Sequence, residues 1–401
     1  MVSKLKITLF FCIALVFGWL SLVCYNYFFD TAAPSLMLTG INEDNYYSGE
    51  VACSVQAKDN YKLLDISIWL DGKPLVQKFK VQKQYCDYGF SIQTKDLKQG
   101  SHTLKLIVND ASRAKNQTIK EINFAVDNAP LQAVLLKTDS EFRVFQGRTL
   151  HLQFQVNKQL KQASIDILSQ RYMCVPESTN SLIYECFVPI KSEEIPNEYP
   201  FTIELLDNVG NTLKIHQKFQ VVQYPFKKQQ LTLNKEKIKT ENEIGIPDYQ
   251  LEKDIQVATE QSPPQKLWHG NFYVPIEMKG ISTDFGTIRT TQERGKYPHN
   301  AVDLLGTPKS VVWACQDGIV VIKNRYAHSG LTVVIDHGLG VLSMYFHLDS
   351  FGPINVGDAI KKGNPIGTIG RTGYASGYHL HFELRINNIA VDPLQWTKQD
   401  F

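Results

Sequence analysis

The sequence predicts a mainly β protein with a single N-terminal transmembrane helix, two β-sandwiches and a strand-rich C-terminal domain. Three observations predict this fold class: one long apolar run at the N-terminus, alternating apolar and polar residues through the middle of the chain, and histidines concentrated between strand-like runs near the C-terminus. At 401 residues the chain is long enough for several domains. Its formal net charge of +2 argues against nucleic acid as a partner.

The N-terminal apolar run covers residues 7–29, and a bilayer-spanning helix needs about 20 such residues. Lys4 and Lys6 precede it, so we expect residues 1–6 to be a cytoplasmic tail and the remainder to be exported. A cleaved signal peptide is the alternative, but its apolar core is usually about 7–15 residues long and ends at small residues. This run is longer and ends in bulky aromatic residues. We therefore predict an uncleaved transmembrane anchor.

Strand-length alternation fills the next two segments. In residues 34–128 it is clearest from Ile66 to Leu70, before the hairpin turn Asp71-Gly72. Residues 129–225 repeat the order, with alternation from Phe201 to Leu205. The two segments predict tandem antiparallel sandwiches that resemble the immunoglobulin-like modules of bacterial surface proteins. We expect these modules to act as spacers or as a contact surface for a protein partner.

The cysteines predict one disulfide in each of these modules. Cys53 and Cys86 lie in the first, and Cys174 and Cys186 lie in the second. An exported compartment permits disulfides, although sequence alone does not fix their connectivity. Buried free thiols are the alternative.

Residues 226–270 are polar and charged, and they predict a linker with one helix. Pro247 suits a first helical turn, and Leu251, Ile255 and Ala258 recur at helical spacing. We expect this helix to pack on the domain that follows. The alternative is that the segment covers the functional site of that domain and inhibits it.

The last segment, residues 271–401, concentrates residue types that bind metals. His299 and Asp303 are four apart, a spacing that can place both side chains on one side. Asp303 lies in an apolar run, where a buried carboxylate needs a cation or hydrogen-bond donors. On a strand, His379 and His381 point to the same face.

Imidazoles and carboxylates are good zinc ligands, and three protein ligands with one open position characterise catalytic zinc. One of His379 and His381 could bind the metal, while the other joins His347 in acid–base chemistry. The residues alone leave this choice open.

These motifs resemble those of the lysostaphin-type zinc metallopeptidases, the cell-wall endopeptidase family, over residues 268–395. The family pattern is His-x-x-x-Asp, Tyr-x-His-Leu and His-x-His, in that order. Here the three motifs are His299 to Asp303, Tyr345 to Leu348, and His379 to His381. The run Gly370 to Tyr378 before the last motif is rich in Gly and Ser and fits a turn-rich loop.

The resemblance implies a mainly antiparallel β-sheet domain with a groove. It also implies one zinc ion per chain, held by His299, Asp303 and His381. His347 and His379 are implied as catalytic residues that orient the attacking water, exchange protons and stabilise the oxyanion.

The implied activity is zinc-dependent hydrolysis of peptide cross-links in bacterial peptidoglycan. The implied location is the bacterial cytoplasmic membrane, as a single-pass protein whose bulk is periplasmic. Two positions depart from the family, because Ala301 and the turn Lys309-Ser310 stand where the family favours Gly. The altered turn and the extra modules motivate a competing hypothesis, a non-catalytic cell-wall-binding or regulatory protein that activates another wall hydrolase. A third hypothesis is an exported protease with protein substrates.

Three further residues allow two interpretations each. Glu383 could accept a hydrogen bond from a ligand histidine or lie on the surface. Arg371 could bind a substrate carboxylate or be a solvated loop residue. We expect His337 to be a turn or core residue instead of a ligand.

Overall fold

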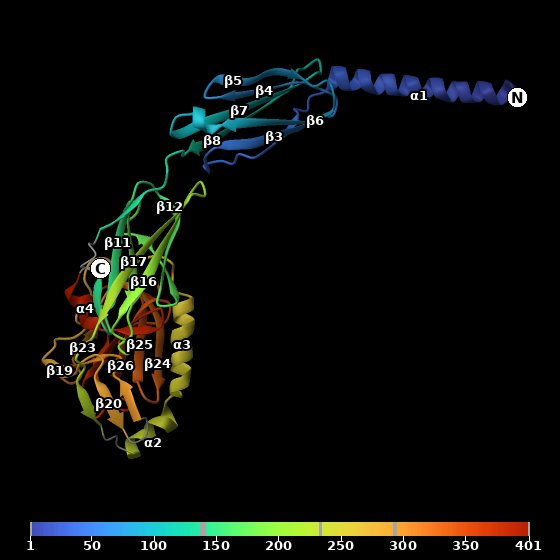
Figure 1. Ribbon diagram of the computed structural model, residues 1–401. Coiled ribbons are helices and arrows are strands. Elements are labelled where there is room, and N and C mark those ends of the chain that lie inside the picture. Colours follow the sequence, from blue (N-terminus) through green and yellow to red (C-terminus); the bar gives the residue numbers. More distant parts are fainter. Residues whose placement is uncertain (1, 137–141, 232–234, 292–294, 400–401) are drawn as a thin grey trace. The chain divides into compact units, whose positions relative to one another are not determined.

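The computed structural model describes residues 2–136, 142–231, 235–291 and 295–399 (Figure 1). The side chains of residues 1–9 and 11, including those of Lys4 and Lys6, lie outside the described part. The chain forms two compact units: residues 1–131 with 207–211, and residues 132–206 with 212–401. The fold is mainly β, with one apolar helix at the N-terminus.

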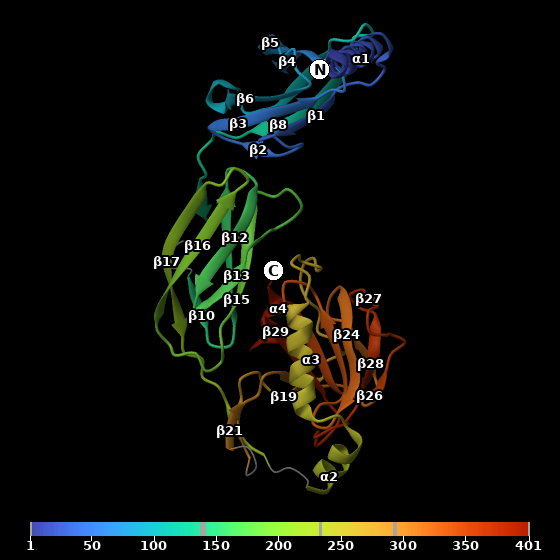
Figure 2. The same cartoon turned by 90° about the vertical axis from the view of Figure 1, so that its right-hand side faces the viewer.

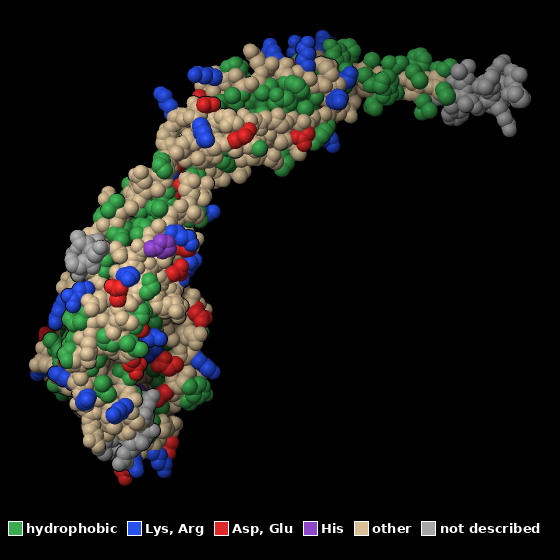
Figure 3. Space-filling model, in the orientation of Figure 1, with side chains coloured by type: hydrophobic (Ala, Val, Ile, Leu, Met, Phe, Trp, Pro, Cys, Tyr) green, Lys and Arg blue, Asp and Glu red, His purple; other side chains and the backbone are tan. Residues whose placement is uncertain are grey.

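Helix α1 (Val2–Phe29) matches the predicted apolar run. Its window Cys12–Phe29 has a mean hydropathy of 1.7, and none of this window is buried. Figure 3 shows hydrophobic side chains along the described part of this helix. Length and composition therefore suit a membrane span, and a signal sequence would show the same properties.

The first unit contains two sheets that enclose one core. The smaller sheet has the order β1 (Ser35–Thr39), β3 (Glu50–Lys58), β6 (Tyr85–Gln93). The larger sheet has the order β2 (Tyr46–Tyr47), β8 (Gln117–Val126), β7 (Gly100–Asp110), β4 (Leu63–Leu70), β5 (Lys73–Lys80). A short 3-10 helix, η1 (Thr94–Asp96), precedes β7. The core joins Val55 of β3 to Ile66 and Leu106 of the larger sheet, all fully buried.

The predicted hairpin turn is present between β4 and β5. Asp71 and Gly72 have φ angles of 51° and 75°, the left-handed values that a type I′ hairpin turn requires. The expected alternation from Ile66 to Leu70 lies in β4.

The second unit begins with another pair of sheets. One has the order β14 (Val175–Pro176), β15 (Ile183–Pro189), β11 (Thr149–Val156), β9 (Ala133–Leu135). The other has the order β10 (Arg143–Phe145), β17 (Thr212–Val222), β16 (Glu198–Asp207), β12 (Leu160–Ile167), β13 (Gln170–Met173). Both sheet pairs are consistent with the expected sandwiches, and their immunoglobulin-like character stays a prediction.

The expected disulfides are not formed, because the cysteines are free thiols. Across β3 and β6, Cys53 pairs with Phe90 and Cys86 pairs with Ala57. The two cysteines are therefore four residues out of register, about 13 Å along a strand. A disulfide needs Cα atoms about 4.4–6.8 Å apart, so the Cys53–Cys86 prediction was wrong.

In the second pair of sheets, Cys174 lies beside Cys186 next to the β14–β15 ladder. Both side chains are buried thiols. The alternative of buried free thiols therefore describes this pair, and the proposed Cys174–Cys186 bridge is absent.

The C-terminal domain is built on an antiparallel sheet, as expected. Its main path has the order β19 (Gly280–Thr283), β22 (Val302–Leu305), β29 (Leu380–Ile386), β26 (Val341–Phe351), β25 (Gly330–Asp336), β24 (Gly318–Tyr326), β27 (Ala359–Ile360). Three further strands pair off this path: β23 (Val311–Trp313), β28 (Pro365–Ile369) and β30 (Ile389–Val391). A separate small sheet has the order β18 (Lys228–Gln230), β20 (Ile288–Thr291), β21 (Gly295–Pro298). The last element is α4 (Pro393–Lys398), which Asp392 caps by accepting a hydrogen bond from the Leu394 amide.

The polar segment before this domain contains two helices, α2 (Lys235–Ile244) and α3 (Asp248–Glu260). Helix α3 is the predicted one, and it lies beside β24 of the sheet (Figure 2). It buries Leu251, Ile255 and Ala258 against that sheet. The sequence prediction missed α2, which has no apolar stripe to signal a helix. Two side chains of α2 reach the loop before His379: Lys237 donates to the Arg371 and Ala375 carbonyls, and Asn242 accepts from the Tyr374 hydroxyl.

Within the second unit, the sandwich and the C-terminal domain share a buried aromatic cluster. Phe187 of β15 contacts Trp268 and Trp396, with ring centroids 5.4 and 5.6 Å away. Thr149 of β11 accepts a hydrogen bond from the Trp396 indole at 2.8 Å and exchanges two backbone hydrogen bonds with the Gln395 side chain. The second sandwich is therefore part of the core of the C-terminal domain and not only a spacer.

Candidate active site

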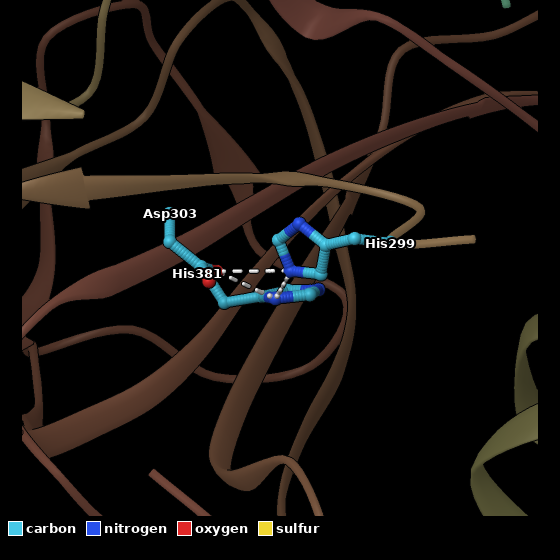
Figure 4. Close-up of side chains that lie close together, drawn as sticks. All are labelled: His299, Asp303 and His381. Atoms are coloured by element: carbon cyan, nitrogen blue, oxygen red, sulfur yellow. Dashed lines mark hydrogen bonds and ion pairs between the residues drawn. The ribbon is translucent and has the colours of Figure 1, made fainter. Parts of the chain in front are cut away.

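Two neighbouring strands bring together three of the predicted site residues (Figure 4). Asp303 of β22 pairs directly with His381 of β29, so both side chains project to one face of the sheet. His299 lies four residues before Asp303, in the turn that leads into β22. All three side chains are largely buried.

The three side chains present one ligand atom each to a common point. His299 Nε2 is 3.1 Å from Asp303 Oδ1 and 3.2 Å from His381 Nδ1, and the last two atoms are 3.1 Å apart. Ligands on tetrahedral zinc, with bonds of about 2.0–2.1 Å, are separated by about 3.3 Å. Donor types and spacing therefore both fit a zinc ion.

The buried Asp303 carboxylate is surrounded by donors. Burial alone would raise its pKa, but hydrogen bonds from His299 and His381 outweigh burial and hold the pKa well below its usual value. Its other oxygen, Oδ2, accepts a hydrogen bond from the Arg289 guanidinium at 2.5 Å. Arg289 extends from β20 and fixes the carboxylate so that Oδ1 faces the two imidazoles.

A row of charged side chains, Glu383, Arg385 and Glu252, orients the His381 ring through its Nε2 atom. Its Nε2 lies 3.4 Å from Glu383 Oε2, which leaves Nδ1 free for a metal. The Arg385 guanidinium donates to Glu383 at 2.5 Å and to Glu252 of α3 at 2.7 Å. Burial would raise the pKa of Glu383, but the Arg385 charge lowers it to about 2. Of the two interpretations of Glu383, the structure supports the hydrogen-bond partner of a ligand histidine.

The remaining two histidines stand beside the triad. The His347 ring lies 4.9 Å from the His379 ring and 5.8 Å from the His381 ring. His347 Nδ1 is 2.8 Å from the Thr372 carbonyl, and His379 Nδ1 is 3.0 Å from the Gly377 carbonyl. A carbonyl only accepts, so both Nδ1 atoms carry the hydrogen and both Nε2 atoms keep a lone pair.

Burial lowers the pKa of both imidazoles, and in His347 the neighbouring histidines lower it further. Both rings are therefore neutral at pH 7. They combine a free lone pair, a fixed orientation and a position next to a metal-type triad, an arrangement that can accept and return protons.

The sequence of this domain matches a known family. Residues 297–393 match the profile of Peptidase family M23. The C-terminal domain is a peptidase M23 domain. The matched segment includes all five residues predicted to form the site.

Curated relatives match the same part of the chain. Peptidoglycan DD-endopeptidase ShyC of Vibrio cholerae is 30% identical over 120 residues, which are 30% of this chain and 28% of the relative. DD-carboxypeptidase/endopeptidase Mpg of Neisseria meningitidis is 35% identical over 126 residues, which are 31% and 29%. The chain thus spans less than a third of the length of these relatives. Among solved structures, the catalytic domain of lysostaphin from Staphylococcus simulans is 26% identical, with a TM-score of 0.27, over 30% of this chain and 92% of that chain.

His347 occupies a strained backbone position in the M23 domain. Its φ is +63°, in the left-handed region that non-glycine residues rarely adopt. The residue lies in β26, where the pairing with β25 and with β28 shifts register nearby. This conformation costs on the order of 1–3 kcal/mol and interrupts the alternation of the strand. Such strain is typical of residues whose side-chain direction matters for function.

The structure also shows the surroundings of His337 and Arg371, for which the sequence allowed two interpretations each. His337 is a core residue of the M23 domain, fully buried, with Nδ1 2.6 Å from the Asp317 carbonyl and Nε2 2.8 Å from Ser343 Oγ. Arg371 is exposed and lies over the Tyr378 ring at 5.4 Å, so the structure favours the loop interpretation. The sequence prediction missed Arg289, which is 14 residues from Asp303 on a separate strand and belongs to no motif.

Proposed function

We propose that the chain is a zinc-dependent endopeptidase that hydrolyses peptide cross-links of bacterial peptidoglycan. The observation that carries this proposal is the convergence of His299, Asp303 and His381 to 3.1–3.2 Å, beside two more histidines. These three residues would hold one zinc ion per chain and leave a fourth position open. Zinc bound by these residues would supply a Lewis acid for a water molecule and the scissile carbonyl.

His347 and His379 carry the proton transfers in this proposal. Each is neutral at pH 7 with a lone pair on Nε2, so either can accept a proton from the attacking water. The resulting imidazolium can return that proton to the leaving amine and stabilise the oxyanion. Thr372 and Gly377 hold the two rings in the tautomer that this role needs.

The substrate and location complete the proposal. Relatives that match this domain are named peptidoglycan DD-endopeptidases, and peptidoglycan lies outside the cytoplasmic membrane. Helix α1 is apolar and exposed, so we propose that it anchors the chain in the bacterial cytoplasmic membrane with the bulk in the periplasm. The two sandwiches would be immunoglobulin-like modules, and the first could provide a contact surface for a protein partner.

The test is cleavage of purified peptidoglycan by the full chain in detergent, with released peptides identified by mass spectrometry. We expect new peptide termini that disappear with a zinc chelator and in His347→Ala. The matched control is His216→Ala, which removes an exposed histidine of the second sandwich. Binding of peptidoglycan without cleavage, with zinc bound, would overturn the proposal in favour of a regulatory protein. Cleavage of proteins but not of peptidoglycan would point to the exported protease.

A further inference from the structure

Three aspartates converge in the first unit, in a part of the chain that the peptidase chemistry does not use. Asp30 directly follows α1, Asp59 directly follows β3, and Asp110 ends β7. One carboxylate oxygen of each lies within 4.8 Å of the other two. The three residues are 5%, 5% and 0% exposed.

Backbone and amide donors hold one oxygen of the first two carboxylates. Asp30 Oδ1 accepts hydrogen bonds from the Ala32 amide and from Asn60 Nδ2, both at 3.0 Å. Asp59 Oδ1 accepts from the Tyr61 amide at 2.8 Å. These contacts fix the orientation of both carboxylates and leave each Oδ2 for another partner.

The second oxygens of Asp30 and Asp59 are buried, and neither has a hydrogen-bond partner in the described part of the chain. Asp110 differs, because Ser112 donates to its Oδ1 and Asn116 donates to its Oδ2 at 2.8 Å. Burying a carboxylate oxygen without a hydrogen-bond partner is unfavourable. Two of them at one point indicate a missing positive partner.

No described lysine or arginine forms an ion pair with these carboxylates. Burial raises the pKa of Asp59, and the charges of Asp30 and Asp110 raise it further. A bound cation would remove both the repulsion and the unpaired oxygens.

We propose that Asp30, Asp59 and Asp110 bind one calcium ion. The donors are all carboxylate oxygens, which hard cations prefer, whereas zinc prefers sites that include nitrogen or sulfur. Magnesium usually keeps several of its waters and binds through one or two carboxylates. Three carboxylates that are almost fully buried leave little room for those waters, so the site favours calcium.

The ion would fasten the end of α1 to the first sandwich. The Arg113 amide donates to the Tyr27 carbonyl at 2.9 Å, and Asn116 Nδ2 donates to the Asp30 carbonyl at 3.2 Å. The Tyr27 ring lies 6.0 Å from the Tyr61 ring. Calcium would add a link between the helix end and the loops after β3 and β7, so that the junction becomes rigid when the ion is bound.

The test uses the zinc-loaded full chain in detergent, freed of divalent ions other than zinc. Calcium binding is measured by isothermal titration calorimetry. Amide hydrogen exchange in β3 and β7 follows the stability of the unit. The variant is Asp59→Asn, and the matched control is Asp65→Asn, which changes a buried aspartate of β4 outside the cluster.

We expect calcium to bind and to slow exchange at least tenfold in the wild type and in Asp65→Asn. Asp59→Asn should lower calcium affinity at least tenfold. Without calcium, Asp59→Asn should exchange more slowly than the wild type, because the substitution removes repulsion. This reversal also shows that the variant is folded. Absence of calcium binding at millimolar concentration, equal binding by Asp59→Asn, or tighter binding of magnesium than of calcium would overturn the proposal.

Discussion

The triad of the M23 domain and the aspartate cluster of the first unit bury negative charge in different ways. Asp303 is shared by two imidazoles and a guanidinium, so its charge is balanced by this chain's own side chains. Asp30 and Asp59 each keep one buried oxygen without a described partner. The comparison teaches that the proposed metal triad is held in place by the charges of this chain alone, whereas the all-carboxylate cluster would depend on an ion to neutralise it.

The largest expected effect comes from removal of one proposed zinc ligand of the triad. His381→Ala removes one of three donors and the contact with Glu383, so zinc binding and peptidoglycan cleavage should both be lost. We expect cleavage to fall by about a thousandfold or more, because the metal supplies several kcal/mol to the transition state. Metal analysis and fragment release measure the two effects. If the variant still cleaves while zinc-free, the triad is not the catalytic centre.

The next largest effect separates chemistry from metal binding. His347→Ala and His379→Ala should lower the cleavage rate by about 10²–10⁴-fold while zinc stays bound, because proton transfer is lost and the ligands remain. Metal content and turnover are measured on the same preparation. Loss of zinc in either variant would instead place that histidine among the ligands.

A smaller effect tests the contact between Glu383 and His381 beside the triad. Glu383→Gln should weaken zinc binding about 10–100-fold, because His381 loses the carboxylate that orients it. The matched control is Glu252→Gln, which changes the exposed end of the same row of charged side chains and should have a much smaller effect. Competition with a chromogenic chelator measures both affinities. Equal weakening by the two substitutions would contradict a specific role of Glu383.

The smallest effect concerns a buried histidine outside the triad. Burial lowers the pKa of His337 to about 4, so the folded state stays neutral while the unfolded state takes up a proton below about pH 6.5. The unfolded state therefore binds more protons between these values, and stability should fall as pH drops from about 6.5 to about 4 and then level off.

Urea unfolding of the full chain at several pH values measures this dependence. His337→Asn should be less stable at pH 7, but its stability should fall less steeply over the same pH range. An unchanged slope would show that other groups dominate. Burial also lowers the pKa of His299 to about 4, so a lowered pKa alone does not distinguish a ligand from a core histidine.

Local spacing explains how much of the candidate site could be predicted. His299 with Asp303, and His379 with His381, are close in sequence, so strand geometry alone places each pair on one side. The pairing of Asp303 with His381 depends on the β22–β29 register, which spacing does not give. The family resemblance named both residues as ligands without that register. Arg289 could not be found this way, because only the tertiary fold brings β20 to the triad.

The rest of the fold also divides into features set by local spacing, which could be predicted, and features set by tertiary pairing, which could not. Alternation predicted strands such as β4, and apolar spacing predicted α3, because one face of each is buried. The Cys53–Cys86 bridge failed because sequence does not give strand register. The aspartate cluster was missed because 80 residues separate its first member from its last.

The aromatic cluster around Trp396 has a consequence for how this chain can be divided or recombined. A fragment that starts at residue 271 loses Trp268, Phe187 and Thr149, which leaves the Trp396 indole without its hydrogen-bond acceptor and exposes an apolar face. The second sandwich and the M23 domain are therefore expected to fold as one unit. A chimaera that keeps both should stay soluble, and a transplant of the M23 domain alone would need a substitute for the lost half of its core.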